Sequence, residues 1–264
     1  MNILFSINHG FVNHMRDCIK SIIRFKSSDG YDFYVMHSDL TNDDIEMLHD
    51  MEEKNIRFHL VYVSADKIKD FPQTGRYPAE IYYRIYASAL LPDDLDRILY
   101  LDADIIVVNP LDELYNMSFD GNYILACTHV RSFLTSVNLR RLGIEEKCPY
   151  VNSGVMLMNL DILRNVQDFH EVEQFVELHK NDLTLPDQDI ITALYGQHVG
   201  IIDSLKYNLS DRVLAFYNST PGNYKIDLDW IQNNTVIIHY CGRQKPWNKN
   251  YVGVLDRFYK QIVR

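Results

Sequence analysis

Strand and helix patterns alternate along the first 63 residues, and this alternation restricts the fold more than any other feature of the chain. Runs rich in β-forming residues are separated by two segments whose apolar residues recur at helical spacing. A strand that returns to the same sheet through a helix does so by a right-handed crossover, which leaves the two strands parallel. The pattern therefore predicts an α/β fold with a mostly parallel central sheet flanked by helices. The expected strands are Asn2–Ile7, Asp32–Met36 and Arg57–Val63, and the expected helices are Phe11–Phe25 and Thr41–Lys54, with Thr41 as N-cap.

The remaining chain adds elements of both kinds, and its 264 residues, 47% of them hydrophobic, suit one large core. We expect a single domain over residues 1–264, with the C-terminal third, from about residue 205, closing over the functional site. Further strands are expected at Ile98–Leu101, Asn122–Cys127, Val151–Asn159, Val199–Ile202 and Thr235–Tyr240. Further helices are expected at Tyr77–Leu91, from Asn109 to Tyr115, and at Leu160–His179, Asp187–Tyr195 and Tyr251–Val263.

Two aspartates interrupt the apolar run Ile98–Val107, one residue apart. Alternate residues of an extended chain point the same way, so Asp102 and Asp104 should face one side. Burying two adjacent negative charges without a counter-ion is costly, and each charge raises the pKa of the other. A divalent cation removes this conflict, and carboxylate oxygens suit a hard metal. The stretch predicts a metal site at the carboxyl end of a strand, where ligands of α/β sheets bind.

A second dense stretch, His239–Trp247, follows an apolar run near the C-terminus. His239 should lie near a strand end and can add one nitrogen to the two carboxylates. Such a mixed set of ligands favours Mn²⁺ over Ca²⁺ and also accommodates Mg²⁺. Gly242 lets a backbone approach a ligand closely, and Lys245 is a point charge suited to a phosphate.

Charge and cysteine usage exclude several classes of protein. The net charge of −10 argues against a nucleic-acid partner. No apolar run is long enough to span a bilayer, and no signal-peptide pattern is present, so we expect a cytoplasmic protein. The four cysteines are scattered and predict neither a zinc ribbon nor a redox motif. The sequences at Asn208 and Asn218 match the glycosylation pattern, which a cytoplasmic protein leaves unused.

Four short motifs together resemble those of the family 8 glycosyltransferases. These enzymes include bacterial lipopolysaccharide α-galactosyltransferases and α-glucosyltransferases and, more distantly, glycogenin. The resemblance covers nearly the whole chain, and the motifs stand in the family's order. They are Tyr-Leu-Asp-Ala-Asp at 100–104, Asn-Ser-Gly at 152–154, Asp-Gln-Asp at 187–189, and His-Tyr-Cys-Gly with Lys-Pro-Trp at 239–247.

This resemblance implies an A-type glycosyltransferase fold, a UDP-galactose or UDP-glucose donor, and transfer with retention to a saccharide or glycolipid acceptor. It implies Mn²⁺ held by Asp102, Asp104 and His239, and a pair, Asp187 and Gln188, at the reacting face. The donor-binding residues that it implies are Asn8, Arg84, Asp102, Ala103, Asn152, Ser153, Gly154, Gly242 and Lys245. Some relatives lie peripherally on the inner membrane face. The segments 129–150 and 216–229 are expected to shape the acceptor pocket, and the oligomeric state stays open.

One departure keeps alternatives open. The family's first strand usually ends in an aspartate that contacts the uridine, and Asn8 stands there instead. Recognition of a different base, or a sugar-nucleotide-binding protein without turnover, is therefore an alternative, and a self-glucosylating transferase is another. A metal-dependent nucleotidyltransferase is less consistent with the sequence, because no Gly-rich basic loop follows the first strand.

Overall fold

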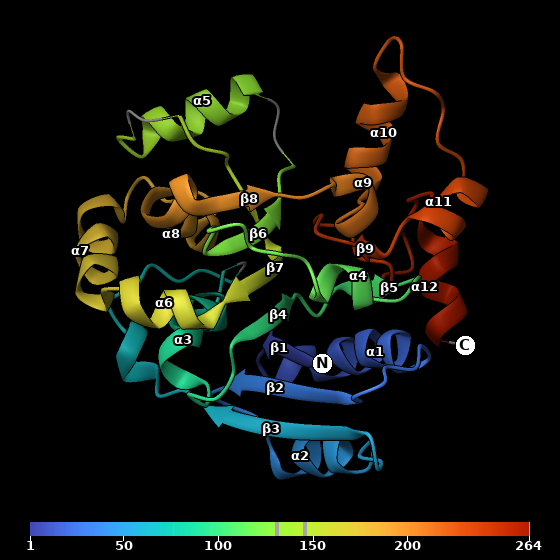
Figure 1. Ribbon diagram of the computed structural model, residues 1–264, viewed down its shortest axis with the longest axis horizontal. Coiled ribbons are helices and arrows are strands. Elements are labelled where there is room, and N and C mark those ends of the chain that lie inside the picture. Colours follow the sequence, from blue (N-terminus) through green and yellow to red (C-terminus); the bar gives the residue numbers. More distant parts are fainter. Residues whose placement is uncertain (76, 130–131, 145–146, 264) are drawn as a thin grey trace.

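A computed structural model describes residues 1–75, 77–129, 132–144 and 147–263, and their central feature is a seven-stranded sheet (Figure 1). The strand order is β3-β2-β1-β4-β7-β6-β8. The bounds are β1 Asn2–Ser6, β2 Tyr31–His37, β3 Ile56–Tyr62, β4 Arg97–Leu101, β6 Ile124–Cys127, β7 Asn152–Asn159 and β8 Val199–Ile201. The expected α/β class and flanking helices are confirmed.

One central strand runs against its neighbours. β1, β2, β3 and β4 pair in parallel, and β6 pairs in parallel with β8, whereas β7 is antiparallel to both β4 and β6. β7 is continuous through Gly154. Because β7 is antiparallel, its first residues lie beside the carboxyl end of β4, as Leu101 pairs with Val155. This orientation brings Asn152, Ser153 and Gly154 to the edge at which Asp102 leaves the sheet.

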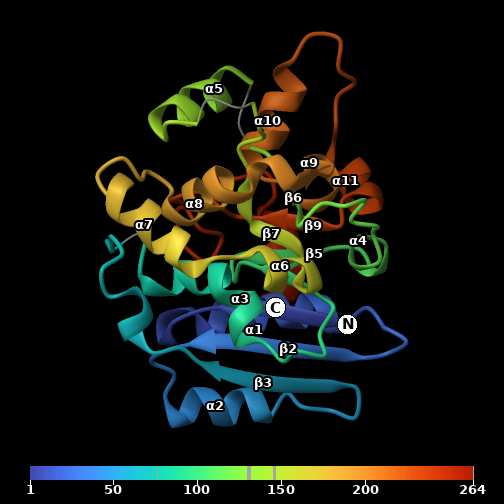
Figure 2. The same cartoon turned by 60° about the vertical axis from the view of Figure 1, so that its left-hand side comes forward.

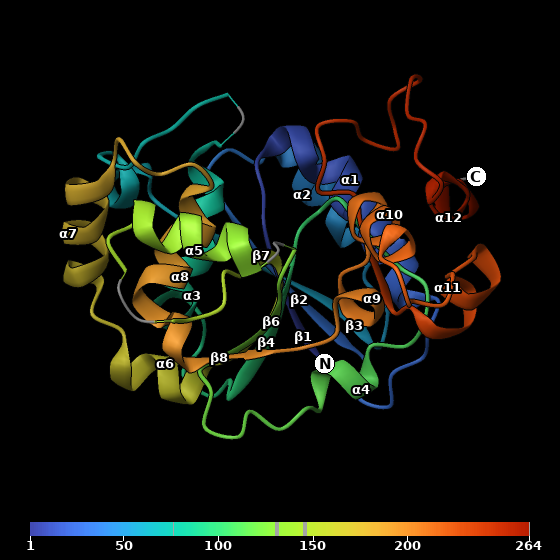
Figure 3. The same ribbon diagram turned by 90° about the horizontal axis from the view of Figure 1, so that it is seen from above.

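Helices cover both faces of the sheet, and side chains of β1 alternate between two apolar clusters. Ile3 and Phe5 join the cluster packed beneath α1 and α2, and Leu4 joins the cluster on the opposite face. Figure 3 shows α6, α7 and α8 on the left of the strands and α1 on the right. The bounds are α1 Val12–Ile23, α2 Asn42–His49, α3 Ala87–Leu90, α6 Leu160–Val166, α7 Phe169–His179 and α8 Pro186–Tyr195.

Several expected helices differ from the observed ones; among them, α2 ends at His49 rather than Lys54, and α4 starts at Asp112 rather than Asn109. The helix expected at Tyr77–Leu91 is mostly a 3₁₀ helix, η3 (Ala79–Tyr86), which α3 follows. The helix expected at Leu160–His179 is divided in two, because Asp168 caps a new helix by accepting a hydrogen bond from the His170 backbone. The last helix, α12 (Asp256–Val263), starts later than expected. The expected cap at Thr41 is confirmed and forms a full capping box with Asp44.

The apolar run around the two aspartates is also divided. β4 ends at Leu101, and β5 (Ile105–Val107) belongs to a separate two-stranded sheet with β9 (Ile237–His239). Residues 103 and 104 form a turn between the two strands. The expectation that strand alternation aligns the carboxylates is therefore wrong, because Asp104 does not continue the extended chain. The turn and the second sheet place it instead.

The C-terminal part packs around a third apolar cluster that includes Ile106 and Val108 from the β5 segment. Figures 1 and 2 show α5 and α10 projecting from the same side of the molecule. No helix among the described residues combines the length and apolar character needed to cross a bilayer. The remaining elements are α4 Asp112–Tyr115, α5 Ser132–Arg141, α9 Ser204–Tyr207, α10 Asp211–Ser219 and α11 Leu228–Asn234, with 3₁₀ helices η1 His9–Phe11, η2 Ala65–Ile68 and η4 Gly196–His198.

Candidate functional site

Backbone pairing brings the two aspartates and the histidine together from distant parts of the chain. The Asp102 N–H donates to the Gly154 carbonyl at 2.9 Å, which joins the end of β4 to β7. In the second sheet, Ile105 pairs with His239. The Tyr240 N–H donates to the Asp104 carbonyl at 2.9 Å. The position of Asp104 is therefore fixed by β9, although 135 residues separate it from His239.

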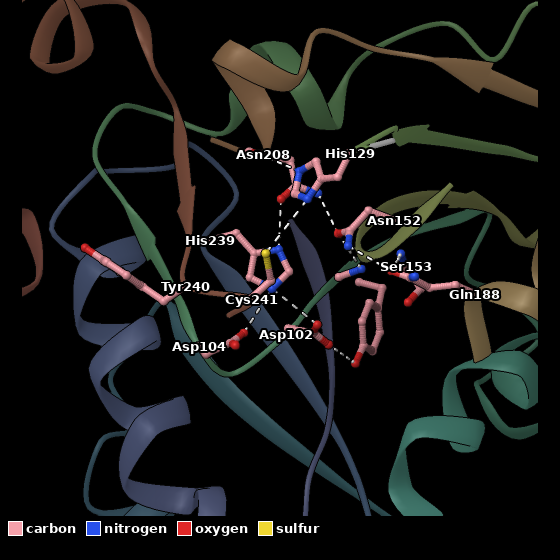
Figure 4. A network of polar contacts seen from close by, with 12 residues as sticks. Asp102, Asp104, His129, Asn152, Ser153, Gln188, Asn208, His239, Tyr240 and Cys241 are labelled. Carbon is pink, nitrogen blue, oxygen red and sulfur yellow. Dashed lines mark hydrogen bonds and ion pairs between the residues drawn. The ribbon is translucent and has the colours of Figure 1, made fainter. Parts of the chain in front are cut away.

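The side chains of Asp102, Asp104 and His239 converge on one point (Figure 4), and we call them the metal-type cluster. One ligand atom from each of Asp102, Asp104 and His239 lies within 4.8 Å of the others. His239 Nε2 is 3.1 Å from Asp104 Oδ1 and 3.5 Å from Asp102 Oδ2. Both His239 Nε2 and Asp104 Oδ1 are buried and face each other as an ion pair, but neither makes a hydrogen bond of acceptable geometry to a described residue. Buried polar atoms normally have partners, so two oxygen donors and one nitrogen donor in this arrangement fit a divalent cation.

Electrostatics at the cluster favour charged acids. Burial would raise the pKa of Asp104, but the positive charges of His239 and Lys245 outweigh burial and hold that pKa well below its usual range. Burial would lower the pKa of His239, yet the negative charge of Asp104 raises it well above its ordinary value. A divalent cation would supply positive charge between the acids in place of this pairing, because metal ligands bind in their deprotonated form.

Lys245 lies at the cluster rather than on the open surface. Its ammonium forms a short ion pair with Asp104 and also donates to the Tyr240 carbonyl at 2.8 Å. The loop that carries Lys245 is held against α1, because the Trp247 ring stacks on His14 with centroids 3.6 Å apart. The side chain of Lys245 keeps about a fifth of its surface exposed. A cation on this loop next to a metal-type donor set is suited to a diphosphate.

Arg84 connects the Asp-Ala-Asp and Asp-Gln-Asp motifs behind the cluster. Its guanidinium is 3.0 Å from Asp102 Oδ1 and 3.2 Å from Asp187 Oδ2, and it lies over the Tyr100 ring. It also donates to the Ser153 carbonyl at 3.1 Å. Burial alone would raise the pKa of Asp102, but Arg84 and His239 hold it below the usual value. Burial raises the pKa of Asp187 in spite of Arg84, so Asp187 is the less well compensated of the two acids.

Gln188 and Asn152 meet above this buried layer. The Asn152 side-chain amide donates to Gln188 Oε1 at 2.8 Å, and the Ser153 hydroxyl donates to Asp187 Oδ2 at 2.6 Å. Gly154 lies directly beneath the cluster. A Cβ built there would be 2.2 Å from His239 Cε1 and 2.6 Å from Asp102 Oδ2. Only glycine leaves room for both side chains to keep these positions.

For three of the expected donor-binding residues, Ala103, Gly242 and Asn8, the structure gives no described side-chain contact with the metal-type cluster that would explain the residue type. Ala103 is buried between the two aspartates. A Cβ at Gly242 would meet nothing closer than 3.8 Å, so packing within the chain does not require glycine there. Asn8 precedes η1 at the carboxyl end of β1, and its side chain does not cap that helix. No described contact joins Asn8 to the metal-type cluster, and its expected role at the base stays a prediction.

Several residues of the site were not anticipated from the sequence. Asn208 is fully buried and accepts a hydrogen bond from His239, so its match to the glycosylation pattern has no functional meaning. The Tyr100 hydroxyl donates to Asp102 at 2.8 Å. Asp189, the third residue of Asp-Gln-Asp, accepts from Tyr150 and Arg141 and anchors the start of α8. The quoted motifs contain Tyr100 and Asp189, whereas nothing local marked Asn208, Tyr150 or Arg141 as residues of the site.

Comparison with known proteins relates this arrangement to enzymes that transfer sugars. The profile of a protein family described as glycosyl transferase family 8 matches residues 2–251. A lipopolysaccharide 1,2-glucosyltransferase of Escherichia coli is 28% identical over 253 residues, covering 94% of this chain and 73% of that protein. A lipopolysaccharide 1,3-galactosyltransferase of Salmonella typhimurium is 24% identical over 266 residues, with 94% of this chain and 73% of that protein covered.

Solved structures agree with the sequence comparisons. The galactosyltransferase LgtC, solved in complex with donor and acceptor sugar analogs, has a TM-score of 0.82 at 22% identity, and the match covers 99% of this chain and 95% of LgtC. The glycosyltransferase GlyE of Streptococcus pneumoniae has a TM-score of 0.72 at 19% identity, with 99% of this chain and 59% of GlyE covered. At these identities the likeness establishes the fold, and the expected A-type glycosyltransferase fold is confirmed.

Proposed function

This chain belongs to glycosyl transferase family 8, and from that premise we propose that it is a retaining hexosyltransferase that uses UDP-galactose or UDP-glucose with a divalent cation. The observation that carries the proposal is the convergence of Asp102, Asp104 and His239 on one point, with buried atoms that make no hydrogen bond of acceptable geometry to a described residue. Mn²⁺ is the cation that this donor set favours, and Mg²⁺ is the second choice.

The surrounding residues supply what a sugar-nucleotide donor needs. When bound, the cation stabilises the negative charge that grows on the departing diphosphate. Lys245 adds a positive charge on the same side, released from Asp104 once a cation neutralises that acid. Asp187 accepts a hydrogen bond from Ser153, and Gln188 accepts one from Asn152. Held in this way, the two side chains can orient sugar hydroxyls at the reacting face. Protonation of the leaving group by a carboxylic acid is unnecessary, which distinguishes this site from that of a glycosidase.

The acceptor is proposed to be a saccharide or a glycolipid of the lipopolysaccharide type, because two of the relatives carry that activity in their names. A cytoplasmic location follows from this proposal. The predicted acceptor segments include α5 and α10, although residues 130, 131, 145 and 146 of the first segment lie outside the described part of the chain. Binding of a sugar nucleotide without any hydrolysis or transfer would favour the non-catalytic alternative. Hexose mass added to the protein itself would favour self-glucosylation.

A thermal-shift screen of nucleotide sugars tests the donor and the cation together. We expect UDP-galactose or UDP-glucose to raise the melting temperature by about 5–10 °C when its concentration is about 100 times Kd and Mn²⁺ is present. Without Mn²⁺ the shift should be much smaller, because the cation joins the diphosphate to the acids. GDP-mannose and CMP-sialic acid serve as controls for the base. No shift with either UDP-hexose in Mn²⁺ would contradict the proposal, and a larger shift with another base would implicate Asn8.

Substitution of Gly154 by alanine tests the position of the cluster. The added methyl group collides with His239 and Asp102, so we expect at least about 10-fold weaker Mn²⁺ binding and a loss of about 1–3 kcal/mol in the free energy of unfolding. Isothermal titration and thermal unfolding measure these effects. Gly75→Ala is the matched control, because a Cβ there meets nothing within 4 Å. Equal Mn²⁺ affinity in Gly154→Ala and the parent would show that the cation binds elsewhere.

A further inference from the structure

Two asparagine side chains, Asn152 and Asn208, connect the metal-type cluster to the reacting face. His239 Nδ1 is 2.8 Å from Asn208 Oδ1, and Asn208 Nδ2 is 2.8 Å from Asn152 Oδ1. Asn152 Nδ2 is in turn 2.8 Å from Gln188 Oε1. Figure 4 shows this unbroken series from His239 to Gln188. The residues come from β9, the end of α9, β7 and α8, so the series spans the site.

Backbone groups determine the direction of every hydrogen bond in the series. The Gly154 N–H, which can only donate, points at Asn152 Oδ1 at 3.2 Å. The opposite end of the Asn152 amide is therefore the NH₂ group that donates to Gln188. Asn208 meets the same Asn152 oxygen and must donate to it, so the Asn208 oxygen faces His239. His239 Nδ1 must then carry a proton, which leaves Nε2 as the nitrogen that faces Asp104.

The backbone around Asn208 is as fixed as its side chain. Its carbonyl accepts from the His129 ring at 2.8 Å. The next residue, Leu209, donates to the Ile237 carbonyl, and its own carbonyl accepts from the His239 N–H at 2.8 Å. The backbone of Asn208 is thus held alongside β9, and its side chain is directed at His239. Asn208 is fully buried, and both the oxygen and the nitrogen of its side-chain amide form hydrogen bonds. An apolar side chain could fill the same space, so the polar atoms at this position indicate that the hydrogen bonds are needed.

We propose that Asn208 is a positioning residue that, through Asn152, sets the orientation of His239 and of Gln188 together. This inference rests on the proposed function, because it assumes that His239 binds the cation and that Gln188 faces the sugar. A side chain at position 208 must accept from an imidazole and donate to an amide at once. Aspartate keeps the acceptor and loses the donor, whereas leucine loses both. The two substitutions therefore separate the two ends of the series.

Mn²⁺ affinity and donor hydrolysis, measured on the full chain, test the assignment. We expect Asn208→Leu to weaken Mn²⁺ binding, followed by electron paramagnetic resonance of free Mn²⁺, by about 10–100-fold. We expect Asn208→Asp to bind Mn²⁺ within about 3-fold of the parent, because an acceptor for the His239 Nδ1–H remains. At saturating Mn²⁺ both variants should hydrolyse UDP-hexose about 10-fold or more slowly, because the link to Gln188 is broken in each.

A matched control comes from Asn218 on α10. Its amide also makes one donor and one acceptor contact, both to Ile226, and it has no described hydrogen bond to the metal-type cluster, although α10 is a predicted acceptor segment. Asn218→Asp should leave Mn²⁺ affinity unchanged, which separates loss of a hydrogen-bonded amide from loss of the series. Parent-like Mn²⁺ affinity in Asn208→Leu, or parent-like turnover in Asn208→Asp, would overturn the positioning role while leaving the proposed function intact. A parent protein that binds no Mn²⁺ would overturn both.

Discussion

Substitution of Arg84 by methionine is expected to lower the free energy of unfolding by about 3–5 kcal/mol and to abolish activity. Methionine fills a similar volume, so the loss comes from charge rather than from a cavity. Arg84 is 4% exposed and is the guanidinium partner of both Asp102 and Asp187. Removing one partner of a buried ion pair leaves the other uncompensated, and here two carboxylates are left. Urea unfolding followed by circular dichroism in EDTA measures the difference without interference from a cation.

The pH dependence distinguishes charge from packing. Burial already raises the pKa of Asp187 with Arg84 present, and without Arg84 it should rise further. An acid whose pKa is higher in the folded than in the unfolded state destabilises the fold as pH rises, so the deficit of Arg84→Met should shrink toward pH 4–5. Asp187→Asn added to Arg84→Met should restore part of the stability. Arg57→Met, which removes an exposed partner of Asp32, is the control, and it should change the free energy of unfolding little, because water and salt screen an exposed ion pair. A deficit that is independent of pH would show that packing dominates.

The sequence predicted the elements whose signals are local. The alternation over the first 63 residues correctly predicted that the first three strands are parallel to one another. Thr41 caps its helix through contacts within one turn. The direction of β7 was missed, because nothing within residues 152–159 distinguishes a parallel from an antiparallel central strand. That direction depends on the long connection through α5, which is a property of the whole chain.

The convergence of Asp102, Asp104 and His239 was expected, but for a partly wrong reason. Strand alternation was expected to align the two acids, whereas a turn separates them and β9 fixes the second one. The cluster still forms, because the motif specifies residue types that the fold brings together. The cation itself stays a prediction. The same distinction explains the partners that were missed. Asn208 and Tyr150 are ordinary residues in the sequence and gain a role only from neighbours far along the chain.

Substitution of Asp104 by alanine is expected to abolish Mn²⁺-dependent turnover while the chain stays folded. Removing a residue that only hydrogen-bonds to a metal ligand weakens metal binding by about 10–100-fold. Removing a ligand itself should therefore weaken Mn²⁺ binding by more than about 100-fold. The fold should persist because Lys245, freed from Asp104, keeps its hydrogen bond to the Tyr240 carbonyl and is partly exposed. Titration with Mn²⁺ and a UDP-hexose hydrolysis assay measure the two losses, and circular dichroism verifies the fold.

Two variants show whether the effect belongs to the cluster. Asp104→Asn keeps one oxygen ligand without the charge and should fall between the parent and Asp104→Ala in Mn²⁺ affinity, because a neutral oxygen binds a hard cation more weakly than a carboxylate. Glu113→Ala removes another carboxylate paired with a lysine, Lys206, and should leave Mn²⁺ affinity unchanged. His239→Ala should weaken binding less than Asp104→Ala, since both acids remain. Full turnover in Asp104→Ala would be incompatible with a cation between these residues.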